Sequence, residues 1–194
     1  MSDMESIDII KVLSDKGKVV AIKTDTVYGL VCNAFDKLAV QNIYKIKNRE
    51  TKKPLSIFVR DISQVDKYAE TKNLTEYSKN LMKKYWPGKL TIVFKKKGNE
   101  LDHLLSGFDS IAIRIPNDDT LLDILNKIDF PLAQTSCNIS GEKEFISAKE
   151  IKLAFGDKID LIVDGGVLSD NKPSTIISVE HNEPIVLRFG DIKI

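Results

Sequence analysis

Four polar residues interrupt an apolar stretch near the start of the sequence. The run Val19–Ile22 is typical of a buried strand, and Lys23–Thr26 follows it directly before the chain becomes apolar again. A simple turn would favour glycine, proline or asparagine at this place. The hydroxyls of Thr24 and Thr26, placed between two buried segments, could instead contact a small polar ligand.

A second group of chemically active residues is a cluster of cations. Residues 45–53 carry five basic side chains, among them Lys47, Arg49 and Lys53. A helix end followed by a solvated loop explains such a cluster, because the carbonyls at a helix C-terminus attract cations. The alternative is a phosphate clamp in which Lys47 and Arg49 reach the same way along an extended segment.

An arginine lies inside the apolar strand expected over Ile111–Ile115. Alternation along the strand puts the isoleucines on one face, and Ala112 and Arg114 on the other. An unpaired buried cation is destabilising by several kcal/mol, so Arg114 must reach the sheet edge or find a partner. A structural ion pair is one interpretation, and a fork that binds a ligand carboxylate is the other.

A further polar segment follows the apolar residues of another expected strand. Residues 133–141 pass from Ala133 into Ser136, Cys137 and Asn138 before reaching Gly141. A turn accounts for this composition. Small residues would also let backbone amides approach the phosphates of a ligand.

The elements that must position these residues mix the helical and the strand period. Helices are expected over residues 5–16, 37–47, 74–85, 120–128 and 147–155, and strands over 18–23, 55–59, 90–95, 111–115, 131–135, 159–163, 174–179 and 184–188. This mixture predicts an α/β fold with a mixed sheet, and 194 residues suit one domain over 1–194.

Composition excludes several classes of protein. The 29 basic and 28 acidic residues give a net charge of +1, so bulk attraction to nucleic acid or membrane is not expected. The two cysteines, Cys32 and Cys137, are expected as buried thiols, because neither has the spacing of a metal ligand. With no signal peptide and no long apolar run, a cytoplasmic protein without membrane contact is predicted.

Taken in order along the chain, these segments resemble the threonylcarbamoyl-AMP synthase family, also called the YrdC/TsaC family. The resemblance extends from about residue 5 to the C-terminal end and rests on KTDTVYGL, KNRETKKPLSIFV, WPGKLTIVF, SIAIRIP, PLAQTSCNISG, DGG with PSTIIS, and VLRFG. It implies a YrdC-like fold, in which a mixed twisted sheet with flanking helices holds a deep, concave, positively lined cleft.

The resemblance also implies an activity and its partners. Members of this family are nucleotidyltransferases that join L-threonine, bicarbonate or carbon dioxide, and ATP into threonylcarbamoyl-adenylate, with release of pyrophosphate. A tRNA-modifying transferase complex then moves the group to the adenosine beside the anticodon, and weak binding of tRNA or double-stranded RNA is an open expectation. Mg²⁺ would accompany ATP without a dedicated protein cage, so no metal ligand is predicted.

The same resemblance assigns roles to individual residues. The catalytic set, around the phosphates and the carbamate, would be Lys47, Arg49, Ser136 and Asn138. ATP would contact these four together with Lys53 and Arg188. L-Threonine would contact Thr24, Thr26, Tyr28, Arg114, Ser174 and Thr175.

Four residues depart from the family pattern, and two other functions compete with the synthase. Lys23 and Lys89 stand where prolines are common, Cys137 stands where alanine is common, and Phe58 stands where some members have a histidine. One competing function is a non-catalytic module for double-stranded RNA or tRNA, which would need basic residues across a wide face but no arginine inside an apolar strand. The other is the carbamoyl-adenylate-forming domain of hydrogenase-maturation proteins, which shares this fold.

Overall fold

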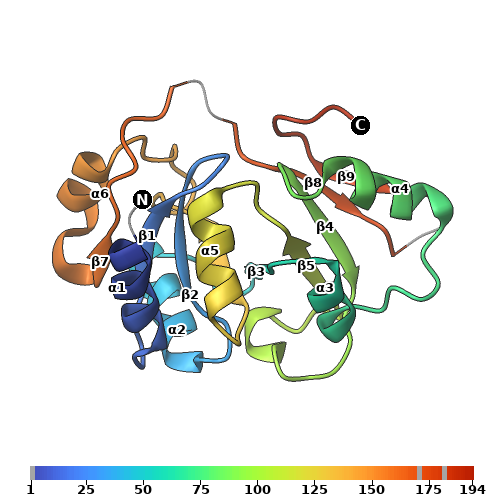
Figure 1. The fold of residues 1–194 in the computed structure, drawn as a ribbon, viewed down its shortest axis with the longest axis horizontal. Coiled ribbons are helices and arrows are strands. Elements are labelled where there is room, and N and C mark those ends of the chain that lie inside the picture. The colour runs from blue at the N-terminus through green and yellow to red at the C-terminus, as the bar shows by residue number, and fades with distance from the viewer. Residues whose placement is uncertain (1–2, 170–171, 181–182) are drawn as a thin grey trace.

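The computed structural model describes residues 3–169, 172–180 and 183–194 (Figure 1). The helices are α1 (Asp3–Ser14), α2 (Lys37–Lys47), α3 (Ile62–Tyr68), α4 (Glu76–Tyr85), α5 (Asp119–Lys127) and α6 (Ala148–Phe155), with the short 3₁₀ helices η1 (Asp102–Leu104) and η2 (Gly156–Lys158). The strands are β1 (Val20–Lys23), β2 (Tyr28–Asn33), β3 (Ser56–Phe58), β4 (Leu90–Lys95), β5 (Ser110–Arg114), β6 (Leu132–Ser136), β7 (Leu161–Ile162), β8 (Thr175–Ser178) and β9 (Ile185–Arg188).

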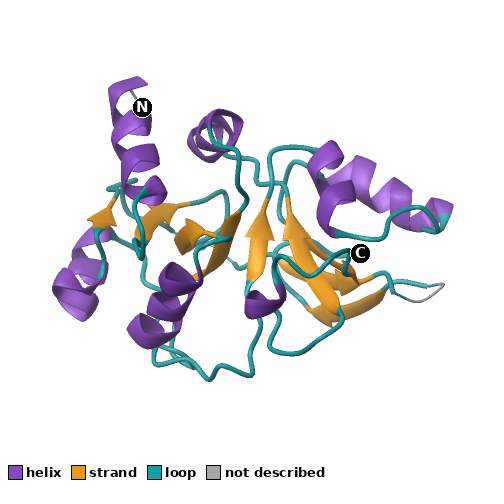
Figure 2. Cartoon of the chain, turned by 90° about the horizontal axis from the view of Figure 1, so that it is seen from below, coloured by secondary structure: helices purple, strands orange, loops and turns teal. Residues whose placement is uncertain are grey.

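All of these strands belong to one mixed sheet. Its order is β7-β1-β2-β6-β3-β5-β4-β8-β9, and helices lie on both sides of it (Figure 2). The pairs β1–β7, β3–β5 and β4–β8 are parallel, and the other neighbours run antiparallel. The α/β fold with a mixed sheet and flanking helices that the sequence predicts is therefore confirmed.

Polar side chains begin most of the helices, as the physics of helix ends requires. The first backbone amides of a helix have no partner within it, so a side-chain oxygen ahead of the helix accepts from them. Such caps precede α2 to α6 and are Asp36, Asp61, Thr75, Asp118 and Ser147. These caps fix the residue at which each helix begins.

The alternation of side chains along the middle strands separates the core from a cavity. Ile57, Ile92 and Ile113 are fully buried in the larger core cluster, and the register places Ile113 beside each of the other two. Because successive side chains of a strand point to opposite sides, their neighbours Ser56, Thr91 and Ala112 emerge on the other side, where they line a cavity. The position of the cavity thus follows from the phase of these strands.

A second core cluster packs α1 and α5 against β1, β2, β3 and β6, on the side of these strands opposite to their residues in the larger cluster. It includes Ile9 and Leu13 of α1, Leu121 and Ile124 of α5, and Phe58 of β3. At about 25 cal/mol per Å² of apolar area, each such side chain contributes roughly 1.5–3 kcal/mol when it is fully buried. This cluster holds β1 and β2, and the turn between them, in place.

The expected helices and strands all occur, with ends that shift by a few residues, and two features differ. The apolar residues after Val27 form the separate strand β2, and the short helix α3 was not expected. The extended conformation considered for residues 47–49 is wrong, because Lys47 ends α2 and Asn48 caps it with a left-handed φ of 50°. No helix in the described part of the chain is long and apolar enough to cross a membrane.

Candidate functional site: an arginine-lined cavity

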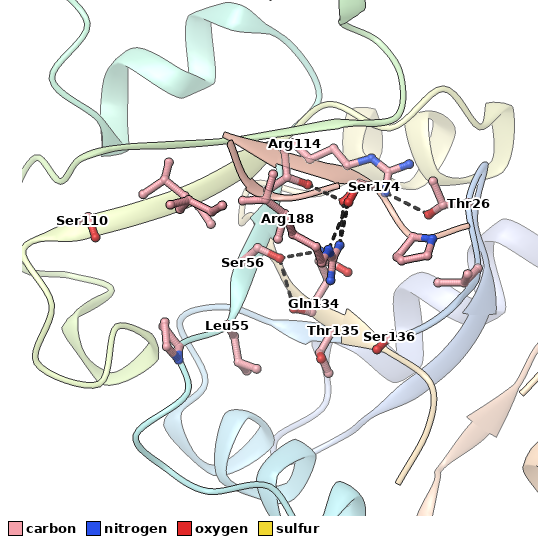
Figure 3. Close-up of a pocket in the computed structure, with 18 of the residues that line it drawn as sticks. Thr26, Leu55, Ser56, Ser110, Arg114, Gln134, Thr135, Ser136, Ser174 and Arg188 are labelled. Atoms are coloured by element: carbon pink, nitrogen blue, oxygen red, sulfur yellow. Dashed lines mark hydrogen bonds between the residues drawn. The ribbon is translucent and has the colours of Figure 1, made fainter. Parts of the chain in front are cut away.

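A cavity of about 400 Å³ opens over the middle strands of the sheet (Figure 3). Three of the chain's four arginines line it, namely Arg49, Arg114 and Arg188. Its other lining residues are hydroxyl, amide or apolar residues, and no carboxylate is among them. Among the described residues, this cavity therefore has the electrostatics of an anion-binding site.

Arg114 of β5 is held by three acceptors. Its Nη2 pairs with Asp25 at 2.5 Å, its Nη1 donates to the hydroxyl of Thr26 at 3.0 Å, and its Nε donates to the carbonyl of Gly88 at 2.9 Å. The residue as a whole is 2% exposed, and its guanidinium lies 5.6 Å from the centre of the Phe58 ring. The ion pair that the sequence suggested is therefore present, in a residue that also lines the cavity.

The guanidinium keeps capacity for a ligand. Arginine carries five N–H donors, and these contacts engage three of them. Burial lowers the pKa of Arg114 while the charge of Asp25 acts in the opposite direction, and an arginine remains protonated throughout the ordinary pH range. Two donors without a partner among these contacts, and a full positive charge, thus belong to a residue that lines the cavity.

The two threonines of the first turn have different roles, which can be assigned because each hydroxyl has only one proton to donate. Thr24 donates its hydroxyl proton to the carbonyl of Val27 at 2.8 Å and accepts from the amide of Thr26 at 3.0 Å. The 3.0 Å contact between the two hydroxyls must then use the proton of Thr26, whose oxygen also accepts from Arg114. Thr24 braces the backbone, whereas Thr26 lines the cavity and keeps one lone pair for a ligand donor.

Ser174 and Arg188 form the wall on the β8–β9 side. Arg188 donates through its Nη2 to the carbonyl of Ser174 at 2.8 Å and to its hydroxyl at 3.2 Å (Figure 3). The same hydroxyl is 2.8 Å from that of Thr91 on β4. Gly190 permits this packing, because a Cβ there would lie 2.2 Å from the carbonyl of Pro173.

Lys47 lies behind the wall of the cavity instead of lining it. The side chain is 1% exposed, and its ammonium donates to the carbonyl of Ser136 and, at 2.8 and 2.7 Å, to the carbonyl and side-chain oxygens of Asn138. Burial lowers the pKa of Lys47 to about 8. Ser136, which does line the cavity, donates to the Asn138 side chain at 2.8 Å. One lysine thus holds the end of β6.

Arg49 lies in the loop after α2, where its side chain reaches the cavity. Its Nε donates to the carbonyl of Lys53 at 3.2 Å, and its Nη2 donates to that of Pro54 at 3.0 Å. Lys53 itself is exposed and lies 3.3 Å from the carboxylate of Glu50. Of the cations in residues 45–53, Arg49 alone lines the cavity.

Tyr28 and Thr175, both assigned to threonine binding by the resemblance, do not line the cavity. The hydroxyl of Thr175 donates to the carbonyl of Ile192 at 2.6 Å and so ties the C-terminal segment to β8. Tyr28 is fully buried, and its hydroxyl contacts Gly165 and Gly166. Both side chains fix segments that border the site.

Several lining residues were missed by the sequence reasoning. Gln134 of β6 donates to the hydroxyl of Ser56 on the neighbouring β3 (Figure 3). The hydroxyl of Thr91 contacts that of Ser174. Thr91 is a single polar residue within the apolar run of β4, and Gln134 begins the polar end of β6; the phase of each strand was the available signal. Phe108 and Leu187 also line the cavity although both are more than half exposed.

The described residues contain no group of three or more His, Cys, Asp or Glu side chains that could hold a metal ion. Cys32 and Cys137 are free, buried thiols, as expected. Burial raises the pKa of Cys137 to about 12, so this thiol stays protonated beside Ser136 and is a poor nucleophile. The cavity therefore offers positive charge and hydrogen bonds instead of a nucleophile or a metal cage.

Fold and site together define an α/β protein whose mixed sheet carries a cavity lined by three arginines and by hydroxyl and amide groups. The family model for Sua5, YciO and YrdC proteins, described as telomere recombination, matches residues 12–190. The chain belongs to this Sua5/YciO/YrdC family.

Named relatives agree with this membership. A provisionally named threonylcarbamoyl-AMP synthase of Methanocaldococcus jannaschii is 42% identical over 178 residues, which are 92% of this chain and 82% of that protein. The threonylcarbamoyl-AMP synthases of Pyrococcus abyssi and Bacillus subtilis are 36% and 35% identical over 91% of this chain. The chain spans only about half the length of these last two, at 52% and 51%.

Solved structures show the same fold. Pyrococcus abyssi Sua5 in complex with L-threonine superposes with a TM-score of 0.90 at 33% identity, over 98% of this chain and 55% of that one. Escherichia coli YciO superposes with a TM-score of 0.87 at 25% identity, over 97% and 90%. A full-length HypF has a TM-score of 0.83 at 24% identity over 96% and 29%, which shows likeness of fold alone.

Proposed function

We propose that the protein is an L-threonylcarbamoyladenylate synthase, a nucleotidyltransferase that makes threonylcarbamoyl-AMP and pyrophosphate from L-threonine, bicarbonate or carbon dioxide, and ATP. The observation that carries this proposal is the cavity in which Arg49, Arg114 and Arg188 converge among hydroxyl and amide groups, with no acid among its lining residues. The names of the relatives and the L-threonine bound to the Pyrococcus abyssi protein support it.

The reaction needs the kind of groups that line the cavity. The neutral amine of L-threonine adds to carbon dioxide, loses a proton and becomes a carbamate. A carbamate oxygen then attacks the α-phosphorus of ATP, and the bond to pyrophosphate breaks. Such a reaction proceeds by positioning and by stabilising negative charge, so it requires cations and hydrogen-bond donors but no protein nucleophile.

L-Threonine would bind at Arg114. Arg114 lines the cavity, and the two N–H donors of its guanidinium that its own hydrogen bonds leave unengaged would bind the carboxylate. The hydroxyl oxygen of Thr26 accepts from Arg114 at 3.0 Å, and its remaining lone pair would accept a hydrogen bond from the amine or the hydroxyl of the substrate. The hydroxyl of Ser174 lies on the neighbouring wall, which completes a small polar subsite.

The phosphates would lie towards Arg49, Ser136 and Arg188, which supply two positive charges and a hydroxyl. Lys47 and Asn138 would act through Ser136, because their contacts hold the end of β6. Burial lowers the pKa of Arg49 and of Arg188, yet both remain cationic. Lys53 would contribute from the exposed rim.

Mg²⁺ would enter with the triphosphate. The lining residues contain no carboxylate, so oxygen ligands for the ion would come from the phosphates and from water. When bound, the ion would neutralise charge on the leaving pyrophosphate. The adenylate product would pass to a tRNA-modifying transferase in the cytoplasm, which consumes the activated threonylcarbamoyl group.

Mass spectrometry of the product tests the proposal. The protein is incubated with ATP, L-threonine and ¹³C-labelled bicarbonate, and the product is expected to be a labelled threonylcarbamoyl-AMP. A parallel reaction with carbamoyl phosphate in place of threonine and bicarbonate tests the chemistry of the hydrogenase-maturation domain. A carbamoyl-adenylate in that reaction, with no threonine adduct in the first, would refute the synthase.

A further inference from the structure

The hydroxyls of Thr91 and Ser174 form a pair on the wall of the cavity. Thr91 lies on β4 and Ser174 directly precedes β8, and their two hydroxyl oxygens are 2.8 Å apart. Both residues line the cavity, although Thr91 is only 1% exposed and Ser174 only 5% exposed. Each hydroxyl has one proton, so in this hydrogen bond one of the two residues donates and the other accepts.

The backbone holds the pair in place. Strands β4 and β8 run parallel, with Leu90 paired to Thr175, and the amide of Thr175 donates to the carbonyl of Lys89 at 3.1 Å. Threonine is branched at Cβ, which restricts its side chain to few rotamers. The hydroxyl of Thr91 is therefore a fixed group, and the hydroxyl of Ser174 is oriented against it.

The direction of the hydrogen bond follows from the partners that are open to each proton. Within the described part of the chain, the hydroxyl of Thr91 has no hydrogen-bond partner other than Ser174. If Ser174 donated, the proton of the buried Thr91 would have no acceptor, which is unfavourable. Thr91 therefore donates to Ser174, and Ser174 keeps its own proton for water or for a ligand in the cavity.

Arg188 determines what the hydroxyl of Ser174 can still do. Its Nη2 donates to that hydroxyl at 3.2 Å and to the carbonyl of Ser174 at 2.8 Å. A serine oxygen has two lone pairs, and Thr91 and Arg188 then occupy both of them. The hydroxyl of Ser174 can therefore act on a ligand only as a donor, next to a guanidinium that also lines the cavity.

We propose that Thr91 is a positioning residue that makes the hydroxyl of Ser174 a hydrogen-bond donor to an anionic oxygen of the substrate. This oxygen belongs either to the carboxylate of L-threonine or to a phosphate of ATP, both of which a donor beside a guanidinium suits. For the choice of these two ligands the inference rests on the proposed function. Thr91 acts through Ser174 and touches no substrate.

Neutron crystallography tests the direction of the hydrogen bond in the protein without ligand, after exchange into D₂O. The deuteron of Thr91 should lie on the line to the Ser174 oxygen, and the deuteron of Ser174 should point away from Thr91. A Ser174 deuteron on that line would overturn the proposal. No substrate is present in this experiment, so its outcome does not depend on the proposed function.

Calorimetry with L-threonine and with a non-hydrolysable ATP analogue shows which anionic oxygen is bound. Ser174→Ala removes the donor and should raise one of the two dissociation constants about 10- to 150-fold, as expected for a hydrogen bond to a charged group. Thr91→Val removes only the group that orients the donor, so it should raise the same constant about two- to tenfold. Thr91→Ser restores a hydroxyl and should bind like the wild type.

A double variant and a matched control separate positioning from general damage. Adding Thr91→Val to Ser174→Ala should cause no further loss of affinity, because Thr91 has then nothing to orient. Thr71→Val should leave both dissociation constants unchanged, since the hydroxyl of Thr71 contacts Asp66 outside the cavity.

Two binding results would overturn the proposal. Unchanged or tighter binding of both ligands in Thr91→Val is one, because a Ser174 that donated to Thr91 would be freed to donate to the ligand. A further loss of affinity in the double variant is the other, because Thr91 would then act by another route. A wild-type protein that binds neither ligand would contradict the proposed function, and the neutron result would still decide the direction of the hydrogen bond.

Discussion

Arg114 of β5 and Asp25 of the β1–β2 turn form a buried ion pair, with side chains only 3% and 8% exposed. Breaking such a pair leaves an uncompensated charge and is destabilising by about 3–5 kcal/mol. The pair therefore orients the guanidinium on which threonine binding is proposed to depend, and Asp25 holds the turn by also accepting from the amide of Asn117 at 3.2 Å.

Replacement of Arg114 should weaken threonine binding much more than ATP binding. Removal of a charged hydrogen-bond partner costs about 1.5–3 kcal/mol, or roughly 10- to 150-fold in the dissociation constant for L-threonine. Arg114→Lys keeps the charge but loses the fork, and it avoids the unpaired Asp25 that Arg114→Ala creates. Calorimetry with L-threonine and with a non-hydrolysable ATP analogue measures both affinities.

Arg60→Ala is the matched control for Arg114→Lys, because Arg60 pairs with Asp61 outside the cavity. An equal loss of affinity for L-threonine and for the ATP analogue in Arg114→Lys would contradict the assigned role.

Thr24 and Thr26 should respond differently to the same substitution. Thr24→Val removes the donor to Val27 and the acceptor for the amide of Thr26, so it should lower the free energy of unfolding by about 1–3 kcal/mol. Thr26→Val removes the lone pair that faces the cavity, so it should mainly raise the dissociation constant for L-threonine. Urea unfolding and calorimetry on both variants distinguish the two effects. A larger binding defect in Thr24→Val than in Thr26→Val would reverse the assignment.

The buried ammonium of Lys47 should make stability depend on alkaline pH. Its pKa is lowered from 10.5 to about 8 in the folded chain, so between these values the unfolded chain binds more protons. The free energy of unfolding therefore rises with pH across this window, by an amount on the order of 3 kcal/mol in total. Below about pH 8 Lys47 is charged in the folded chain, and burial of this charge lowers the free energy of unfolding.

Urea unfolding of the wild type and Lys47→Met, compared from about pH 7.5 to about 10.5, isolates this contribution. The wild type should gain stability relative to the variant as the pH rises, because the other titrating groups are common to both. Lys52→Met, at an exposed position of the same stretch, is the matched control. A difference between wild type and Lys47→Met that does not change with pH would show that Lys47 is not titrating in this window.

Local chemistry made the elements predictable. The strands that contain Ile92 and Ile113 and the helix that ends at Lys47 were placed correctly, because their apolar periods and end signals lie within a few residues of each other. The short helix α3 was missed, since its seven residues offer too few turns to establish a period. The order of strands in the sheet depends on long-range pairing and could not be read from local pattern.

The site was predicted as a set of segments more accurately than as a set of side chains. Arg49, Arg114 and Arg188 do converge on one cavity, which their positions in a loop and in two separate strands could suggest only through the resemblance. The positions of Lys47 and Tyr28 behind the walls were not predictable, because their partners at Asn138 and Gly165 are distant in sequence. Gln134 and Ser56 could have been found from strand phase, since each is polar at a position that faces away from the core.

Synthase activity is tested most directly by the rate of pyrophosphate release from ATP and bicarbonate, with and without L-threonine. L-Threonine should stimulate release strongly, and L-serine and carbamoyl phosphate should do so much less. The stimulated rate should fall in Arg114→Lys but not in Arg60→Ala. Release that is independent of threonine, or equal release with carbamoyl phosphate, would show that the protein is not a threonylcarbamoyl-AMP synthase.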